Sequence, residues 1–313
     1  MKRTVAAVVL YVALALNSLA GNPVIEDPVV GNPVAENPVA ENPVAENPVA
    51  ENPVAGNPVA GNPVAGKEHY RHLKDISYTA VNEQDAYRKE RCRLDIYYPE
   101  DVKEFKTLVW FHGGGLEGGS KGLREEFRNR GFAVVDVNYR LYPKVKCPGY
   151  LEDAALAVSW VFNNIAQYGG SPSKIFIGGH SAGGWLTLML TLDKRWLAEY
   201  GIDADRIAKA YPVGGQTMTH FTIKKERGLD VDLPFIDDMA PSFHVRKEGA
   251  PLMLITGDRN LEMLARYEEN AHLLAILKHF GHEASLFELE GFDHVNVLSP
   301  ACLLIRKDIV KAE

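Results

Sequence analysis

Three short motifs in the sequence bring together residue types that can carry out nucleophilic catalysis. The first is Gly179-His180-Ser181-Ala182-Gly183, which follows a β-rich run at 174–178 and opens a helical pattern. A serine on a strained turn between a strand and a helix presents its hydroxyl at the edge of the sheet, and the helix N-terminus favours negative charge there. The pattern therefore predicts that Ser181 is a nucleophile.

The second motif is His112-Gly113-Gly114-Gly115, directly after the apolar run 107–111. Glycines at this position let backbone N–H groups approach a carbonyl oxygen, and together with the N–H of Ala182 they can form an oxyanion hole. A phosphate-binding loop is not indicated, because no Gly-Lys-Ser/Thr follows. We interpret His112 as a residue that orders the loop.

The third motif is Gly291-Phe292-Asp293-His294, which follows the last β-rich run at 285–289. Its position predicts that His294 lies at the same edge of the sheet as Ser181. A histidine there can take the serine proton as a general base and return it as a general acid.

The carboxylate that would orient His294 is expected between Ser181 and His294, since hydrolases with this type of serine turn use the order Ser, Asp/Glu, His. The apolar run 251–256 ends in Gly257-Asp258-Arg259-Asn260-Leu261-Glu262. Asp258, directly after the strand, is the first choice. Glu262 is the fallback, with the alternative that it is a solvated glutamate in the first turn of a helix.

Short β-rich runs alternate with helical patterns through residues 67–313, which predicts one α/β domain with a doubly wound, mostly parallel sheet. Residues 217–248 interrupt the alternation and are expected to form a small cap-like insertion beside the site. The predicted strands are 93–98, 107–111, 132–138, 175–178, 207–213, 252–256 and 285–289. The predicted helices are 123–130, 151–168, 184–200, 261–280 and 300–311.

The first 66 residues have a different character. Lys2 and Arg3 precede an apolar run, and small residues stand before position 21, which predicts a signal peptide at 1–20 and a secreted or periplasmic protein. Residues 21–66 repeat Asn-Pro-Val every five residues, and the regular prolines predict a disordered spacer.

Composition excludes several other classes. The chain of 313 residues is 46% hydrophobic and 24% charged, with a net charge of −7, which is unlike a basic nucleic-acid binder. No apolar run reaches the roughly 18 residues of a bilayer span. The three cysteines fit neither a disulfide scaffold nor a zinc motif, and we expect all of them to be unpaired.

At this point the sequence resembles esterases of the α/β-hydrolase fold. It is most similar to secreted acetyl xylan and feruloyl esterases, which are related to the hormone-sensitive-lipase-like carboxylesterases. The resemblance implies that Ser181 is the nucleophile, His294 the base and Asp258 the orienting acid, with Gly114, Gly115 and Ala182 in the oxyanion hole. It rests on the three motifs, on Asn138-Tyr139-Arg140-Leu141-Tyr142-Pro143, Glu152-Asp153-Ala154 and Thr256-Gly257-Asp258-Arg259.

The resemblance implies hydrolysis of carboxylic esters through an acyl-enzyme, without a metal or organic cofactor. Export would suit a small ester or an acylated plant polysaccharide, carrying acetyl or feruloyl groups, as substrate. Two alternatives remain open: an arylformamidase-like amidase and an inactive binding module of the same fold. Val295-Asn296 stands where relatives often have glycine after the histidine.

Overall fold

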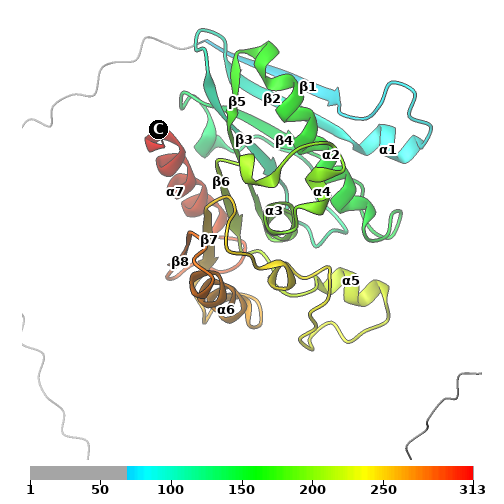
Figure 1. Cartoon of the computed structure of the whole chain (residues 1–313), viewed down its shortest axis with the longest axis vertical. Coiled ribbons are helices and arrows are strands. Elements are labelled where there is room, and N and C mark those ends of the chain that lie inside the picture. The colour runs from blue at the N-terminus through cyan, green and yellow to red at the C-terminus, as the bar shows by residue number, and fades with distance from the viewer. Residues whose placement is uncertain (1–68, 313) are drawn as a thin grey trace, which may run out of the picture. The chain divides into compact units, whose positions relative to one another are not determined.

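A single eight-stranded sheet organises residues 69–312, the part of the chain that the computed structural model describes (Figure 1). The strand order is β1-β2-β4-β3-β5-β6-β7-β8. The pairs β1–β2 and β2–β4 are antiparallel and all other pairs are parallel. The strands are β1 (Tyr70–Ser77), β2 (Arg93–Pro99), β3 (Phe105–Phe111), β4 (Ala133–Val137), β5 (Gly170–His180), β6 (Lys209–Val213), β7 (Leu252–Gly257) and β8 (Ala284–Leu289).

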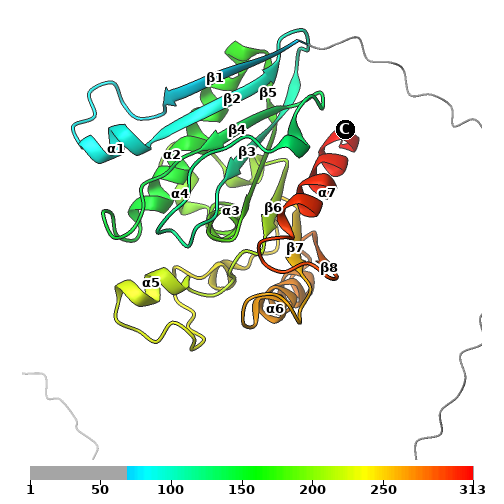
Figure 2. The same cartoon turned by 180° about the vertical axis from the view of Figure 1, so that it is seen from behind.

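Helices cover both faces of the sheet, as Figures 1 and 2 show from opposite sides. Residues of α2 (Gly149–Asn164), α3 (Ala182–Leu192) and α6 (Arg266–His279) share one core, whereas α7 (Leu298–Lys311) and the 3-10 turn η1 (Glu125–Phe127) contribute to the other. Alternate residues of β3 enter the two cores, as the period of two of a strand requires. The α/β-hydrolase-like, doubly wound architecture predicted from the sequence is confirmed.

The remaining elements are short. They are α1 (Ala86–Arg91), η2 (Ile165–Tyr168), α4 (Arg195–Ala198), η3 (Ala204–Arg206), α5 (Phe221–Glu226) and η4 (Pro241–His244). Within residues 69–312, no helix has the length and apolar character needed to cross a bilayer. Cys92, Cys147 and Cys302 are free thiols, and Cys92 and Cys302 are buried in different cores. The predicted signal peptide at 1–20 and spacer at 21–66 lie outside the described residues.

All seven predicted strands are present, but β1 was not predicted. Its sequence is largely polar, as is common for a strand at the edge of a sheet. Its pairing with β2 has a register shift between Leu73 and Ile76. The predicted helix 123–130 is wrong, since only η1 forms and Asn129 takes a left-handed conformation (φ 56°). The predicted helix 184–200 is interrupted after α3, where the side chain of Asp193 accepts a hydrogen bond from the N–H of Arg195.

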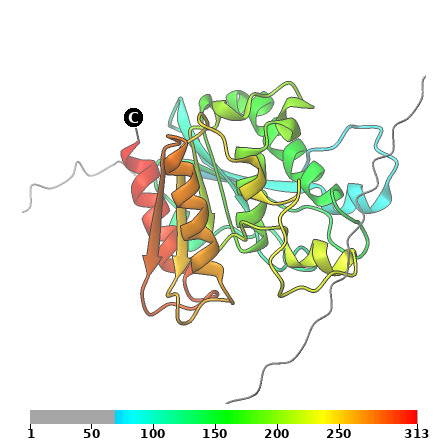
Figure 3. The same cartoon turned by 60° about the horizontal axis from the view of Figure 1, so that its bottom comes forward.

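The segment 217–248 forms the expected insertion between β6 and β7, and it carries α5 and η4. Figure 3 shows it reaching beyond the helices that cover the sheet. Several hydrogen bonds join it to the rest of the domain, including the following two. The hydroxyl of Thr222 donates to the carbonyl of Gly115, and the N–H of Thr217 donates to Glu269 on α6 at 3.0 Å. The insertion is therefore anchored to the glycine motif.

A buried carboxyl pair lies in the antiparallel part of the sheet. Asp95 of β2 faces Asp136 of β4, and Lys121 binds Asp95 at 2.6 Å. Asp136 is only 1% exposed, and its Oδ1 has no hydrogen-bond partner among the described residues. Burial, with the neighbouring charge of Asp95, raises the pKa of Asp136 to about 7.

This raised pKa predicts a pH-dependent stability. A carboxyl whose pKa is higher in the folded protein than in the unfolded chain stabilises the fold in acid, and that contribution is lost as the pH rises through about 7. We expect the melting temperature of the wild type, measured relative to that of Asp136→Asn, to fall between pH 5 and pH 8. Thermal unfolding of both proteins across this pH range measures the difference in melting temperature. Parallel curves for the two proteins would contradict the prediction.

Candidate active site

Ser181 occupies a sharp turn between β5 and α3. Its backbone has φ 55° and ψ −116°, a conformation that costs free energy for a residue with a side chain. The chain around it must approach its neighbours closely: a Cβ on Gly183 would lie 2.1 Å from the carbonyl oxygen of Phe111, and a Cβ on Gly179 would lie 2.5 Å from that of Gly183. The turn is further fixed by a 2.7 Å hydrogen bond from the N–H of Ser181 to Val213 on β6.

His294 lies beside this serine, in the loop between β8 and α7. Its Nε2 is 2.9 Å from the Oγ of Ser181, and its Nδ1 is 2.7 Å from the Oε2 of Glu262. The structure thus brings together a hydroxyl, an imidazole and a carboxylate in a continuous hydrogen-bonded chain. Such a chain can remove the serine proton while the carboxylate stabilises the imidazolium that forms.

The carboxylate in contact with His294 is Glu262, and the expectation that Asp258 would occupy this place is wrong. The helix expected from position 261 begins only at Arg266, so Glu262 lies in the preceding loop, where its side chain turns inward. That side chain is 0% exposed, so the alternative of a solvated glutamate in a first helical turn is also wrong. The longer glutamate side chain spans the distance from this loop to His294.

Hydrogen bonds hold Glu262 in its charged form. Burial by itself raises the pKa of this carboxyl, but the hydrogen bond and electrostatic interaction with His294 and the N–H groups of Gly257 and Met263 outweigh it. The pKa of Glu262 is therefore lower than usual, and the group is ionised at neutral pH.

Asp258 instead joins two loops. Its Oδ2 accepts from the N–H of Gly291 at 2.9 Å, and its own N–H donates to the carbonyl of Phe292 at 2.8 Å. Its other oxygen accepts from the N–H of Asn260 at 2.9 Å. These backbone hydrogen bonds lower the pKa of Asp258, and they tie the loop of Glu262 to the loop of His294.

The glycine motif runs past Ser181 at the end of β3. Gly114 (φ 112°) and Gly115 (φ 64°) have left-handed backbones that turn the chain sharply. Ala182 is the first residue of α3, where an N–H has no acceptor within the helix. The oxyanion hole expected from these three residues stays a prediction.

His112 orders this loop rather than joining the hydrogen-bonded chain of Ser181. Its Nδ1 is 2.7 Å from the carbonyl oxygen of Gly113, and its ring stacks on Tyr139 with centroids 4.4 Å apart. The hydroxyl of Tyr139 donates to the carbonyl of His112 at 2.8 Å. Burial lowers the pKa of His112 to about 4, so the ring is neutral at neutral pH.

A buried ion pair supports the segment that carries Tyr139. Arg140 binds the fully buried Asp153 of α2 through Nε at 2.7 Å and a terminal nitrogen at 2.9 Å. Arg91 donates to the carbonyl of Tyr139 at 3.2 Å. Arg140 and Asp153 thus affect the site indirectly, because they support the segment of Tyr139 on which His112 of the glycine motif stacks.

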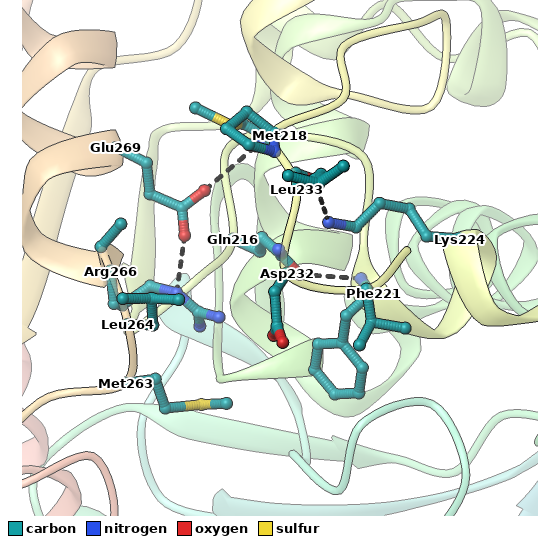
Figure 4. Close-up of a pocket in the computed structure, with 13 residues that line it drawn as sticks. Gln216, Met218, Phe221, Lys224, Asp232, Leu233, Met263, Leu264, Arg266 and Glu269 are labelled. Atoms are coloured by element: carbon teal, nitrogen blue, oxygen red, sulfur yellow. Dashed lines mark hydrogen bonds and ion pairs between the residues drawn. The ribbon is translucent and has the colours of Figure 1, made fainter. Parts of the chain in front are cut away.

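A cavity of about 430 Å³ opens between the insertion and the start of α6 (Figure 4). Two of its lining residues lie near the motifs: the ring of Phe221 would lie 3.1 Å from a Cβ on Gly115, and Met263 directly follows Glu262. Most of its wall is apolar, with Lys224, Asp232, Arg266, Glu269 and Gln216 as polar members. The apolar lining residues are Met218, Phe221, Val231, Leu233, Pro234, Met263, Leu264 and Ala265.

A second cavity, of about 460 Å³, adjoins the glycine motif and is more polar in residue type. Its lining comprises Trp110, His112, Gly113, Gly114, Gly119, Ser120, Gly122, Arg124, His180 and Leu298. No group of three or more His, Cys, Asp or Glu residues in the range 69–312 is arranged to hold a metal ion.

Comparison with known proteins relates this chain to esterases. Residues 94–210 match the profile of the BD-FAE family. Venom carboxylesterase-6 of Apis mellifera is 40% identical over 89 residues, which are 25% of this chain and 16% of that protein. Carboxylesterase NlhH of Mycobacterium tuberculosis is 34% identical over 102 residues, 30% of this chain and 32% of that protein. The matched region thus spans about a third or less of each relative.

Solved structures establish the fold over most of the chain. A truncated carbohydrate esterase from gut microbiota superposes with a TM-score of 0.60 at 18% identity, covering 80% of this chain and 97% of that one. A thermophilic esterase from Thermogutta terrifontis, bound to propionate, gives a TM-score of 0.57 at 19% identity and covers 78% and 93%. The resemblance to α/β-hydrolase esterases stated from the sequence is confirmed.

Proposed function

We propose that this protein is a serine carboxylesterase whose catalytic residues are Ser181, His294 and Glu262. One observation carries the proposal: the chain of hydrogen bonds from Ser181 Oγ to His294 (2.9 Å) and from His294 to Glu262 (2.7 Å). The similarity of residues 94–210 to the BD-FAE family and to carboxylesterases supports ester hydrolysis as the reaction.

The first half-reaction forms an acyl-enzyme. His294 Nε2 takes the proton of Ser181 as Oγ bonds to the ester carbonyl carbon, and the carbonyl oxygen becomes an oxyanion. The N–H groups of Gly114, Gly115 and Ala182 are our assignment for its stabilisation. His294 then gives its proton to the departing alkoxide as the bond between carbon and the alcohol oxygen breaks.

The second half-reaction reverses these roles with water. His294 takes a proton from water, the resulting hydroxide attacks the acyl carbon, and the carboxylic acid leaves as the proton returns to Ser181 Oγ. Through both steps Glu262 stays ionised, keeps the proton of His294 on Nδ1, and stabilises the imidazolium.

We further propose that the substrate is an acylated carbohydrate carrying acetyl or aromatic acyl groups. Support comes from the BD-FAE match and from the fold of a carbohydrate esterase. The apolar cavity lined by Phe221, Met263 and Leu264 has the size and character of an organic acyl-group site, and the cavity at Ser120 and Arg124 offers polar side chains.

Export is part of this proposal, because a polymeric substrate is met outside the cell. It rests on the charged and apolar pattern of residues 1–20. N-terminal sequencing of protein recovered outside the cytoplasm should begin near residue 21. Recovery of the uncleaved chain from the cytoplasm alone would contradict export and leave the catalytic assignment in place.

Replacing the nucleophile tests the central assignment. Ser181→Ala should lower kcat by about 10⁴-fold or more without destabilising the fold, because it removes one partly exposed oxygen. The measurements are turnover of p-nitrophenyl acetate, acetylated xylan, methyl ferulate and a formanilide, with the surface change Ser173→Ala as control. Turnover of formanilide but not of the esters by the wild type would favour the amidase. Retention by Ser181→Ala of more than about a tenth of kcat, on a substrate that the wild type hydrolyses, would exclude Ser181 as the nucleophile.

Two carboxylate substitutions decide the acid. Glu262→Gln should reduce kcat by roughly 10³- to 10⁴-fold, since the amide cannot stabilise the imidazolium of His294. Asp258→Asn should reduce it less than about tenfold, because Asp258 joins loops and does not contact the ring. Glu268→Gln, an exposed change on α6, is the control. If Asp258→Asn were the more damaging of the two, the assignment of Glu262 would fail.

A further inference from the structure

We propose that His180, the residue before Ser181, is a positioning residue that holds the backbone of His294 in the catalytic arrangement. The inference rests on the proposed function of Ser181, His294 and Glu262. His180 ends β5 and reaches across the serine turn toward the loop between β8 and α7. It therefore links the strand that carries the nucleophile to the loop that carries the base.

The contact is a direct hydrogen bond. His180 Nε2 lies 2.7 Å from the carbonyl oxygen of His294, and the two imidazole rings have centroids 4.9 Å apart. A carbonyl oxygen only accepts hydrogen bonds, so the Nε2 of His180 must carry the proton. Its Nδ1 then carries none when the ring is neutral.

The surroundings keep this ring neutral and fixed in place. Burial, with the neighbouring His294, lowers the pKa of His180 to about 4, so no second positive charge opposes the imidazolium of His294 at neutral pH. Gly113 gives the ring room, since a Cβ there would lie 3.1 Å from His180 Nδ1 and 3.2 Å from the Cβ of Ser181. The glycine motif, His180 and Ser181 are therefore packed as one unit.

The loop that carries His294 needs a hydrogen bond of this kind to keep its position. Gly291, Phe292, Val295 and Asn296 are exposed, so apolar burial holds the loop only weakly. Hydrogen bonds from Gly291 to Asp258 and from Val297 to the carbonyl of Asp293 secure its two ends. At His294 itself, the backbone carbonyl is secured by His180.

The hydrogen bond from His180 matters because the ring of His294 must exchange hydrogen-bond partners during turnover. Nε2 serves Ser181, the leaving alcohol and water in turn, so the contact to Ser181 cannot hold the ring throughout. Glu262 fixes one edge of the ring, and His180 fixes the backbone from which the ring extends. Displacements well below 1 Å in such groups slow a reaction substantially.

Three substitutions separate the hydrogen bond from the bulk of the side chain. The amide nitrogen of glutamine is as many bonds from Cα as His180 Nε2, so His180→Gln can still donate to the carbonyl of His294. His180→Asn is polar but shorter, and His180→Leu has no donor. We expect Leu and Asn to lower kcat on p-nitrophenyl acetate by about 10- to 100-fold with KM within about twofold, and Gln to recover most of the loss.

A second readout does not depend on ester turnover. The proton shared by His294 Nδ1 and Glu262 should give a far-downfield proton NMR signal in ¹⁵N-histidine-labelled wild type and in His180→Gln. It should broaden or vanish in His180→Leu and His180→Asn. The surface change His272→Gln serves as the control for labelling and stability.

The outcomes distinguish this proposal from the proposed function. If wild type hydrolyses no ester but the NMR signal follows His180 as described, the function fails and the positioning role stands. Equal kcat and an unchanged signal in all three variants would overturn the positioning role. It would also be overturned if all three, Gln included, lost activity in proportion to a fall in melting temperature, because His180 would then act only through packing.

Discussion

The strained backbone of Ser181 is the constraint around which this site is arranged. A φ of 55° is unfavourable for serine, so the conformation persists only because neighbouring contacts leave no alternative. Gly179 and Gly183 let β5 and α3 approach β3 closely, and the hydrogen bond to Val213 ties the turn to β6. The strained turn is thus held by its contacts with β3 and β6, two neighbouring strands of the sheet.

The surrounding loops depend on this turn from different directions. The glycine motif passes over it and is ordered by the stack of His112 on Tyr139, which rests on the buried pair of Arg140 and Asp153. Asp258 joins the two loops that carry Glu262 and His294. Side-chain hydrogen bonds, a ring stack and a buried ion pair in these loops therefore set the relative positions of Ser181, His294 and Glu262.

Sequence reasoning succeeded where local chemistry alone determines the structure. Ser181 and the glycine motif are recognisable because a sharp turn between strand and helix tolerates only small neighbours, and His294 because it follows a strand that ends at the same edge. The sequence predicts the wrong carboxylate beside His294 because Asp258 and Glu262 both follow β7, and only the start of α6 at Arg266 shows which one turns inward. That start depends on tertiary packing, which helical periodicity does not report.

Other errors have the same origin. β1 is too polar to be recognised as a strand, since it lies at the edge of the sheet and is held by pairing with β2. The segment 123–130 has a helical pattern, but the left-handed Asn129 ends it after one 3-10 turn. In both places, backbone geometry outweighed the residue preferences that a sequence reveals.

Adjacent residues in the loop between β7 and α6 have different roles. Glu262 binds His294, while Met263 and Leu264 form part of the wall of the cavity of about 430 Å³, and the N–H of Met263 donates to Glu262 at 3.0 Å. Selection for a new substrate at Met263 or Leu264 would therefore also move the carboxylate. A change at Leu233, in the insertion, would alter the shape of this cavity without such a direct link to Glu262.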